Sequence, residues 1–288
     1  MLGFQIWDVF TERAFSGNPL AVVSDADILT TAQMQAMARQ FNLSETIFVM
    51  APRDRAHTAR VRIFTPTAEI PFAGHPTIGC ALHLSKGRDM RIVLEEKAGP
   101  VPVQVRDGQA DFIAPRLPVM LPGRAEPGLI ARALDLPADA IGPDGHQPGI
   151  WQGGPAFLFV PIRDPASLAA ARPVEPCWSQ AVVPGIVGAY LYTPDRGGYR
   201  ARMFAPTAGI PEDPATGSAS AILAGPLLAS GVLSRGENRI ALRQGIEMGR
   251  PSRIGLTAIV RDGALTEIRI SGRAAKVAEG RITIPEVE

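Results

Sequence analysis

Cysteine is scarce in this 288-residue chain, and so are several other features that would identify a class of protein. The two cysteines, Cys80 and Cys177, cannot build a disulfide framework, which suits a reducing cytosol. No apolar run approaches the roughly 20 residues that span a bilayer, and the start, MLGFQIWDVF, lacks the basic region and cleavage pattern of a signal peptide. A net charge of +1 argues against nucleic-acid binding, which needs clustered basic residues. We therefore expect a cytoplasmic protein that binds neither membranes nor nucleic acids.

Several motifs of nucleotide, metal and nucleophile chemistry are absent as well. No Gly-x-Gly-x-x-Gly follows a predicted strand, and there is no Walker loop and no Gly-x-Ser-x-Gly. Four histidines and two cysteines do not make a metal-ligand set, so Cys80 and His83 are expected to pack in a core. Cys80 is expected in the middle of a helix, which disfavours a cysteine nucleophile. The chemistry must therefore be carried by other side chains.

Proline, glycine and apolar residues are abundant. The 27 prolines and 29 glycines lie at turns between short apolar segments, which is typical of a β-rich fold. Apolar residues recur at helical spacing over Thr31–Phe41, with Thr30 or Thr31 as the cap, and a second helix is predicted over Thr77–Ser85. Predicted strands outnumber helices in both halves of the chain.

One motif occurs twice, 140 residues apart. The first copy, RIFTPTAEIPFAGHPTIG, runs from Arg62 to Gly79, and the second, RMFAPTAGIPEDPATGSA, runs from Arg202 to Ala219. Seven of the first ten positions are identical. Each copy is predicted to form a strand, a proline-rich turn, one polar residue before a proline, and the start of a helix. A repeat of this length predicts a duplicated architecture.

The duplication predicts an α+β fold of two similar domains, each a curved, mostly antiparallel sheet or barrel around a central helix. We place the linker near Pro118, so that the domains are residues 1–118 and 119–288, with a return of the last strand to the first domain left open. The second-domain helix that opens at Gly217 should break or kink at Pro226. A pseudo-two-fold relation predicts that the active site lies in the cleft between the domains.

The two copies differ at the polar residue before the helix. After a slip of two positions, His75-Pro76 in the first copy falls on Asp213-Pro214 in the second. The helix amides at Ile78-Gly79 and at Gly217-Ser218 are then expected to be unbonded and to attract a carboxylate, with the Ser218 hydroxyl assisting. Taken singly, His75 reads equally as a turn residue, Asp213 as a helix cap and Ser218 as a first-turn serine. The exchange of histidine for aspartate within a repeat favours a functional reading.

Glu45 is the best candidate for a general base. It lies at the start of an apolar strand, Ile47–Val49, where a charged side chain fits a site or, alternatively, a solvated strand end. Burial in a site would raise its pKa towards the range of a general acid/base. The corresponding position of the second half, near Gly185, offers no carboxylate. One base favours a proton shuttle over a two-base racemase.

Five segments carry a family resemblance, in order and across nearly the whole chain: DVFTERAFSGNPLAVV, NLSETIFV, FAGHPTIG, EDPATGSA and QGIEMGRPS. Together they resemble the PhzF (phenazine biosynthesis-like) family and, more remotely, the diaminopimelate epimerase fold. The resemblance implies a cofactor-free isomerase of a small carboxylate compound, usually a homodimer. In phenazine producers the substrate is a dihydro-hydroxyanthranilate, and a glutamate moves a proton between ring carbons.

The resemblance also implies roles for particular residues. The proton-transferring glutamate matches Glu45 in the NLSET segment, and the other catalytic positions match His75 and Asp213. The substrate-binding positions match Asn18, Gly74, Gly217 and Ser218. The epimerases carry two cysteines at the positions of His75 and Asp213, which argues against thiol-pair racemisation here. The alternatives that stay open are a catalytically silent binding or regulatory protein and a two-base amino-acid epimerase.

Overall fold

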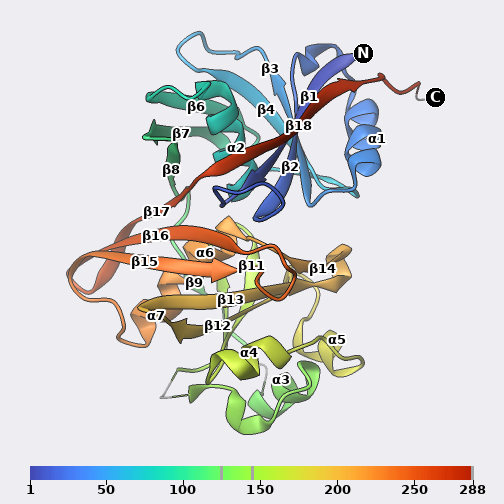
Figure 1. Ribbon diagram of the computed structural model, residues 1–288. Helices are drawn as coiled ribbons and strands as arrows, with labels where there is room; N and C mark the ends of the chain where they lie inside the picture. The colour runs from blue at the N-terminus through green and yellow to red at the C-terminus, as the bar shows by residue number, and fades with distance from the viewer. Residues whose placement is uncertain (124–125, 144–145, 287–288) are drawn as a thin grey trace. The chain divides into compact units, whose positions relative to one another are not determined.

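The computed structural model describes residues 1–123, 126–143 and 146–286. Two compact units divide the chain, one made of Met1–Ile113 with Ser271–Glu288, the other of Ala114–Ile270 (Figure 1). The division near Pro118 inferred from the sequence lies a few residues inside the second unit. The last strand does return to the first unit, because β18 (Ala274–Ile282) pairs antiparallel with β1 along its length.

The first unit is a curved sheet in the strand order β18–β1–β2–β3–β4–β6–β7–β8, with the neighbours β2–β3 and β4–β6 parallel and the others antiparallel. Its other elements in chain order are β1 (Leu2–Val9), β2 (Asn18–Val23), η1 (Ala26–Ile28), α1 (Thr31–Phe41), β3 (Glu45–Met50), β4 (Ala59–Phe64), β5 (Glu69–Ile70), α2 (Gly74–Ser85), β6 (Met90–Glu96), β7 (Gly99–Arg106) and β8 (Gln109–Ile113).

The second unit repeats this plan in the order β9–β10–β11–β12–β13–β15–β16, with β11–β12 and β13–β15 parallel. Its elements are β9 (Val119–Met120), α3 (Pro127–Ala133), η2 (Ala138–Ala140), β10 (Gly149–Gln152), β11 (Ala156–Pro161), α4 (Pro165–Ala170), α5 (Cys177–Ala181), β12 (Ala189–Asp195), β13 (Gly198–Ala205), η4 (Pro206–Ala208), β14 (Ile210–Asp213), α6 (Gly217–Ile222), α7 (Ala224–Ala229), β15 (Gly236–Gln244), β16 (Ser252–Arg261) and β17 (Ala264–Gly272). The mixed α+β class inferred from the repeat is confirmed.

The repeated arginines each form a bidentate pair with a glutamate, although the two glutamates stand at different positions of the repeat. Arg62 forms a two-pronged ion pair with Glu69, at 2.8 and 2.9 Å, and its guanidinium lies 5.1 Å from the ring centre of Phe64. Arg202 pairs in the same way with Glu212, at 2.8 Å for both contacts. These bidentate pairs fix the turn after β4 and after β13. The shared part of the motif is therefore scaffold.

The central helix of the first unit, α2, is buried along most of its length and packs against β1, β2, β3, β6, β7 and β8. It begins at Gly74, so the predicted start at Thr77 is wrong by one turn. Proline is tolerated in a first turn, where its missing N–H has no helical partner, and Pro76 therefore lies inside the helix. His75 consequently projects from the first helical turn rather than from the loop before it.

Two other helix predictions are confirmed. Thr30 caps α1 in a capping box with Gln33, each side chain bonding the other's backbone N–H. In the second unit the helix that opens at Gly217 ends at Ile222 and resumes as α7, with Leu223 between them. Pro226 lacks the N–H that would bond Ile222, which explains the interruption.

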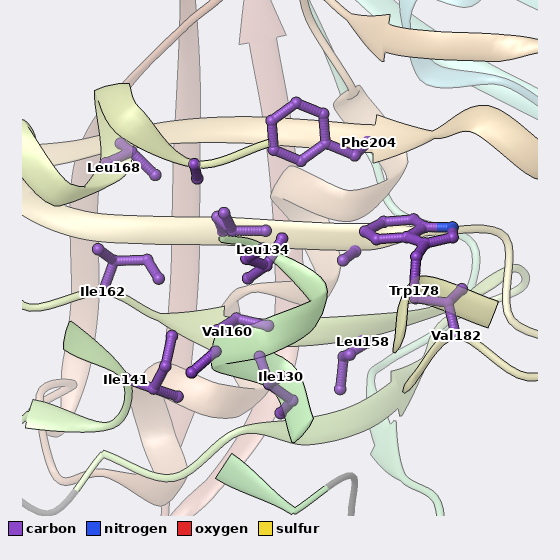
Figure 2. Packing of buried hydrophobic residues seen from close by; sticks show 14 residues of the cluster. Ile130, Leu134, Ile141, Leu158, Val160, Ile162, Leu168, Trp178, Val182 and Phe204 are labelled. Atoms are coloured by element: carbon purple, nitrogen blue, oxygen red, sulfur yellow. The ribbon is translucent and has the colours of Figure 1, made fainter. Parts of the chain in front are cut away.

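The apolar cluster drawn in Figure 2 belongs to the second unit, where α3, α4 and α5 cover β11–β13. Trp178 and Phe204 pack edge to face with ring centres 6.5 Å apart, and Ile130, Leu168 and Val160 fill the space between helices and sheet. No helix in the described part of the chain combines the length and apolarity that crossing a membrane requires.

A glycine in the middle of α2 sets how closely this helix approaches the sheet. A Cβ at Gly79 would lie 2.6 Å from Leu20 Cδ2 and 2.8 Å from Val9 Cγ2, both fully buried. We predict that Gly79→Ala lowers the free energy of unfolding by about 1–3 kcal/mol, because the overpacking outweighs the better helix propensity of alanine. Chemical denaturation followed by circular dichroism measures this. Gly3→Ala, where a Cβ meets nothing within 4 Å, is the control, and equal stability of the two variants would contradict the prediction.

Candidate active site

The first unit brings together three predicted residues at the starts of β2, β3 and α2. Parallel pairing of β2 with β3 sets Leu20 opposite Glu45, so Asn18 and Pro19 begin their strand beside the start of β3. His75 Nδ1 lies 3.1 Å from Glu45 Oε2, and the two side chains are 4% and 14% exposed. Asn18 is fully buried. Glu45 is therefore part of a buried polar group and not a solvated strand end.

The surroundings of His75 fix its charge and its tautomer. Burial lowers the pKa of His75 to about 3, against the opposing effect of a hydrogen bond to the Pro19 carbonyl. Nε2 has no hydrogen-bond partner among the described residues, so the ring donates to Pro19 through Nδ1–H. His75 is thus a neutral imidazole whose Nε2 lone pair is available to accept a hydrogen bond.

The second unit builds a different polar group at the repeated position. Asp213, 8% exposed, ends β14, and its Oδ2 accepts a hydrogen bond from the Thr216 hydroxyl. Gln244 Nε2 donates to the Asp213 backbone carbonyl at 2.7 Å and to Thr216 Oγ1 at 2.9 Å, and its Oε1 accepts from the Thr216 N–H at 3.2 Å. Thr216 therefore has its own proton directed at the Asp213 carboxylate.

The segment QGIEMGRPS holds the same turn from outside. Ser252 Oγ donates to the Pro214 carbonyl at 2.8 Å. A Cβ at Gly245, whose φ is +72°, would lie 2.7 Å from that carbonyl oxygen, so the close approach requires glycine. The segment QGIEMGRPS, which contributed to the family resemblance, thus positions the turn that carries Asp213.

The remaining predicted residues lie at the two helix starts. Gly74 is the first residue of α2, Gly217 the first of α6, and Ser218 is half-buried behind it. The amides of Ile78 and Gly79 belong to the second turn of α2, so the expectation that they are unbonded is wrong. Within the described residues no group of three or more His, Cys, Asp or Glu could hold a metal ion.

Two buried residues behind these groups carried no predicted role. One is Gln244, and the other is Glu96 at the end of β6, where Thr77 Oγ1 lies 2.7 Å from Glu96 Oε1. A signal for Glu96 exists in the sequence, since it continues the inward positions Ile92 and Leu94 at strand spacing and sets a carboxyl group on an apolar face.

Each unit thus assembles its own polar group: Asn18, Glu45, Gly74 and His75 in the first, and Asp213, Gly217 and Ser218 in the second. The first sets the carboxyl group of Glu45 against the imidazole of His75. The second offers a hydrogen-bonded carboxylate. That both face one cleft remains a prediction.

Comparison with known proteins is consistent with this geometry. The family model described as phenazine biosynthesis-like protein matches residues 7–280. An uncharacterized isomerase, mll1393 of Mesorhizobium japonicum, is 39% identical over 98% of both chains. The trans-2,3-dihydro-3-hydroxyanthranilate isomerase of Pseudomonas aeruginosa is 34% identical, covering 96% of this chain and 98% of its own.

Solved structures agree on the fold. A Bacillus anthracis protein of the PhzF family superposes with a TM-score of 0.88 at 24% identity, covering 98% of this chain and 99% of its own. A hydroxyproline epimerase from Agrobacterium vitis, at a TM-score of 0.59 and 13% identity, covers 97% of this chain and 91% of its own and shows the same fold more distantly. Fold and named relatives together define an isomerase of the epimerase-like fold. The chain belongs to the phenazine biosynthesis-like protein family.

A pH-dependent stability follows from the neutral state of His75. Its folded pKa is depressed, so its contribution to stability is complete above the unfolded value of 6.5 and is lost as the pH falls towards 3. Between pH 7 and pH 5 we predict that the wild type loses about 2 kcal/mol more than His75→Gln, whose amide can still donate to Pro19. Denaturant titrations at both pH values measure the difference. Parallel curves for the two proteins would show that His75 is already charged in the folded state.

Proposed function

We propose that this protein is a cofactor-independent isomerase in which Glu45 removes a proton from one carbon of a small carboxylate-bearing substrate and returns it to another. The observation that carries the proposal is the buried contact between Glu45 and a neutral His75. Relatives covering nearly the whole chain are named as isomerases of trans-2,3-dihydro-3-hydroxyanthranilate, a cyclic compound with carboxylate, amino and hydroxyl groups.

Glu45 has the position that such a shuttle needs. Its partly exposed carboxylate can reach a substrate, while the buried side is held against the imidazole. The proton taken from one carbon stays on the carboxyl group until it is delivered to the next, so the reaction needs no net donor or acceptor. General acid–base catalysis of this kind contributes typically 10²–10⁴-fold to a rate. His75 Nε2 is proposed to accept a hydrogen bond from the substrate.

Asp213 is proposed to recognise the part of the substrate that can donate hydrogen bonds. Because Thr216 donates to it, Asp213 is stabilised as an acceptor, which suits an amino or hydroxyl group and repels a carboxylate. Asn18, Ser218 and the backbone amides of Gly74 and Gly217 are proposed to bind the remaining polar groups. We further propose that the protein acts in the cytoplasm as a homodimer, which sedimentation velocity of the purified protein would test.

Deuterium exchange tests the role of Glu45. With trans-2,3-dihydro-3-hydroxyanthranilate in D₂O, the wild type should incorporate deuterium into the ring, as followed by NMR. We predict that Glu45→Gln lowers the rate by at least about 10²-fold, because the amide cannot take the proton, while binding measured by calorimetry changes little.

The matched control is Glu12→Gln, an exposed glutamate of the same unit paired with Arg273, which should exchange at the wild-type rate. Undiminished exchange by Glu45→Gln would rule out the assignment of the base. If the wild type binds the compound and related cyclic and amino carboxylates but exchanges none of them, the protein is a binding or regulatory member of the family. Interconversion of amino-acid enantiomers in a chiral assay would instead establish a two-base epimerase.

A further inference from the structure

Two buried residues occupy equivalent places in the two units. In the first unit the parallel pairing of β4 with β6 sets Arg60 opposite Glu95, and Glu96 follows as the last residue of β6. In the second unit β13 and β15 pair in the same way, Arg200 opposite Arg243, and Gln244 follows as the last residue of β15. Since Arg60 and Arg200 stand 140 residues apart, as the repeat does, Glu96 and Gln244 are counterparts.

Glu96 and Gln244 each contact a threonine that lies close in the chain to the polar residue of its unit. Gln244 donates to Thr216, and the Thr216 hydroxyl then donates to Asp213, the polar residue of its unit. Glu96 contacts Thr77, which lies two residues after His75, the polar residue of the first unit. An acid and an amide of equal shape thus stand behind the two polar groups.

The hydrogen bonds of the Thr77 hydroxyl indicate the protonation state of Glu96. Its Oγ1 lies 2.7 Å from Glu96 Oε1 and 2.8 Å from the Ala73 carbonyl oxygen. A hydroxyl has one hydrogen, so it can donate to only one of two acceptors. Both contacts are satisfied together only if Glu96 carries a proton, donates it to Thr77, and leaves Thr77 to donate to Ala73. The sequence Glu96–Thr77–Ala73 then repeats the directions of Gln244–Thr216–Asp213.

We propose that Glu96 is kept protonated in the working enzyme and, as the counterpart of Gln244, is a positioning residue for the first turn of α2 that carries His75. The inference rests on the proposed function for its catalytic consequence. Ala73 is the N-terminal cap of α2, so the chain of hydrogen bonds ends on the backbone next to Gly74 and His75. Glu96 acts through Thr77 and does not touch the substrate.

Glu96 is buried and, within the described part of the chain, has no ion-pair partner. It is 7% exposed, and its Oε2 has no hydrogen-bond partner among the described residues. Burial raises the pKa of Glu96 to about 8, against the effect of the Thr77 hydrogen bond. On α2 the facing titratable group is Cys80, whose thiol pKa is raised by its own burial and by Glu96.

Charged groups on the neighbouring elements are engaged elsewhere. Next to Glu96 along the chain, Glu95 binds His57 and the backbone amides of Arg53 and Asp54, and Lys97 reaches Glu69. On β4, Arg60 pairs with Asp27 and Arg62 with Glu69. Arg106, at the end of β7, is exposed to solvent.

Unfolding equilibria test the proposal without any substrate. A folded pKa raised from 4.5 to about 8 gives a contribution to stability that is complete below pH 4.5 and is lost as the pH rises towards 8. Replacing the acid by the neutral amide in Glu96→Gln removes this loss. We expect the ratio of the unfolding constants of wild type and Glu96→Gln to rise by about 70-fold between pH 5 and pH 7.

Glu95→Gln is the matched control, because the neighbouring glutamate has the opposite behaviour. Backbone hydrogen bonds from Asp54 and Arg53 lower the pKa of Glu95 to about 2, so its contribution is constant over the same pH range. An infrared C=O stretch of a protonated carboxyl group at pH 7, lost in Glu96→Gln and kept in Glu95→Gln, supports the proposal. The proposal is overturned if the ratio of the unfolding constants of wild type and Glu96→Gln changes with pH as little as the ratio for Glu95→Gln, or if the infrared band is absent.

Activity towards trans-2,3-dihydro-3-hydroxyanthranilate tests the positioning role. Glu96→Gln should keep kcat within a fewfold of wild type and should lack the decline of kcat that ionisation of Glu96 causes near pH 8. Glu96→Ala and Thr77→Val should lower kcat by about 10–100-fold with a smaller change in KM, because a buried partner is left unsatisfied. The reciprocal Gln244→Glu should be impaired at pH 8 and recover as the pH is lowered.

The outcomes separate the two claims. Equal damage by Glu96→Gln and Glu96→Ala would overturn the positioning role, since rescue by the neutral isostere is its signature. A wild type that is inactive on this compound refutes that substrate for the proposed function, while the unfolding and infrared results still decide whether Glu96 is protonated.

Discussion

The burial of the first turn of α2 within the curved sheet of the first unit is the constraint on which the proposed chemistry depends. A helix start needs partners for its backbone groups, and here it has no access to water to supply them. The cap Ala73 offers no side-chain hydrogen bond, so Thr77 satisfies its carbonyl from within the helix. The same burial lowers the pKa of His75 to about 3. Stability and reactivity therefore have one origin at this turn.

The two units share their strand pairing and their arginine–glutamate pairs but differ in the polar residues at the turn before the helix. Arg62 and Arg202 each form a bidentate pair with a glutamate, and the parallel pairing of β4 with β6 has the same register as that of β13 with β15. The polar residue of the turn and the buried residue behind it differ together between the two units. Where the turn carries Asp213, the residue behind it is an amide that cannot ionise, which avoids a second buried anion. Where the turn carries His75, the residue behind it is Glu96, which fits the site as a neutral acid.

The repeat was sufficient to predict the α+β class and the duplicated plan, because its two copies specify the same strand, turn and helix. The cap of α1 and the interruption at Pro226 were also predictable, since both depend on residues close in the chain. The start of α2 was not. A residue before proline favours extended backbone, which argued for a loop at His75, whereas packing of the helix inside the sheet extended it to Gly74.

Long-range partners were beyond the sequence for a related reason. Strand spacing turns Glu96 inward, but it does not say that Thr77 will meet it, since the two come from different elements. The return of β18 to β1 likewise depends on pairing across the length of the chain. The motif residues were found from a pattern, and the residues that orient them only from contacts.

A neutral histidine is the appropriate neighbour for a proton shuttle. An imidazolium 3.1 Å from Glu45 would strongly favour the carboxylate, because opposite charges at that distance stabilise each other. Glu45 could then accept a proton only at the expense of that attraction. A neutral imidazole imposes no such bias, which suits a group that must hold and release a proton in one turnover. The proposed neutral state of Glu96 would serve the same end as the burial of His75, since neither would then place a charge on the first turn of α2.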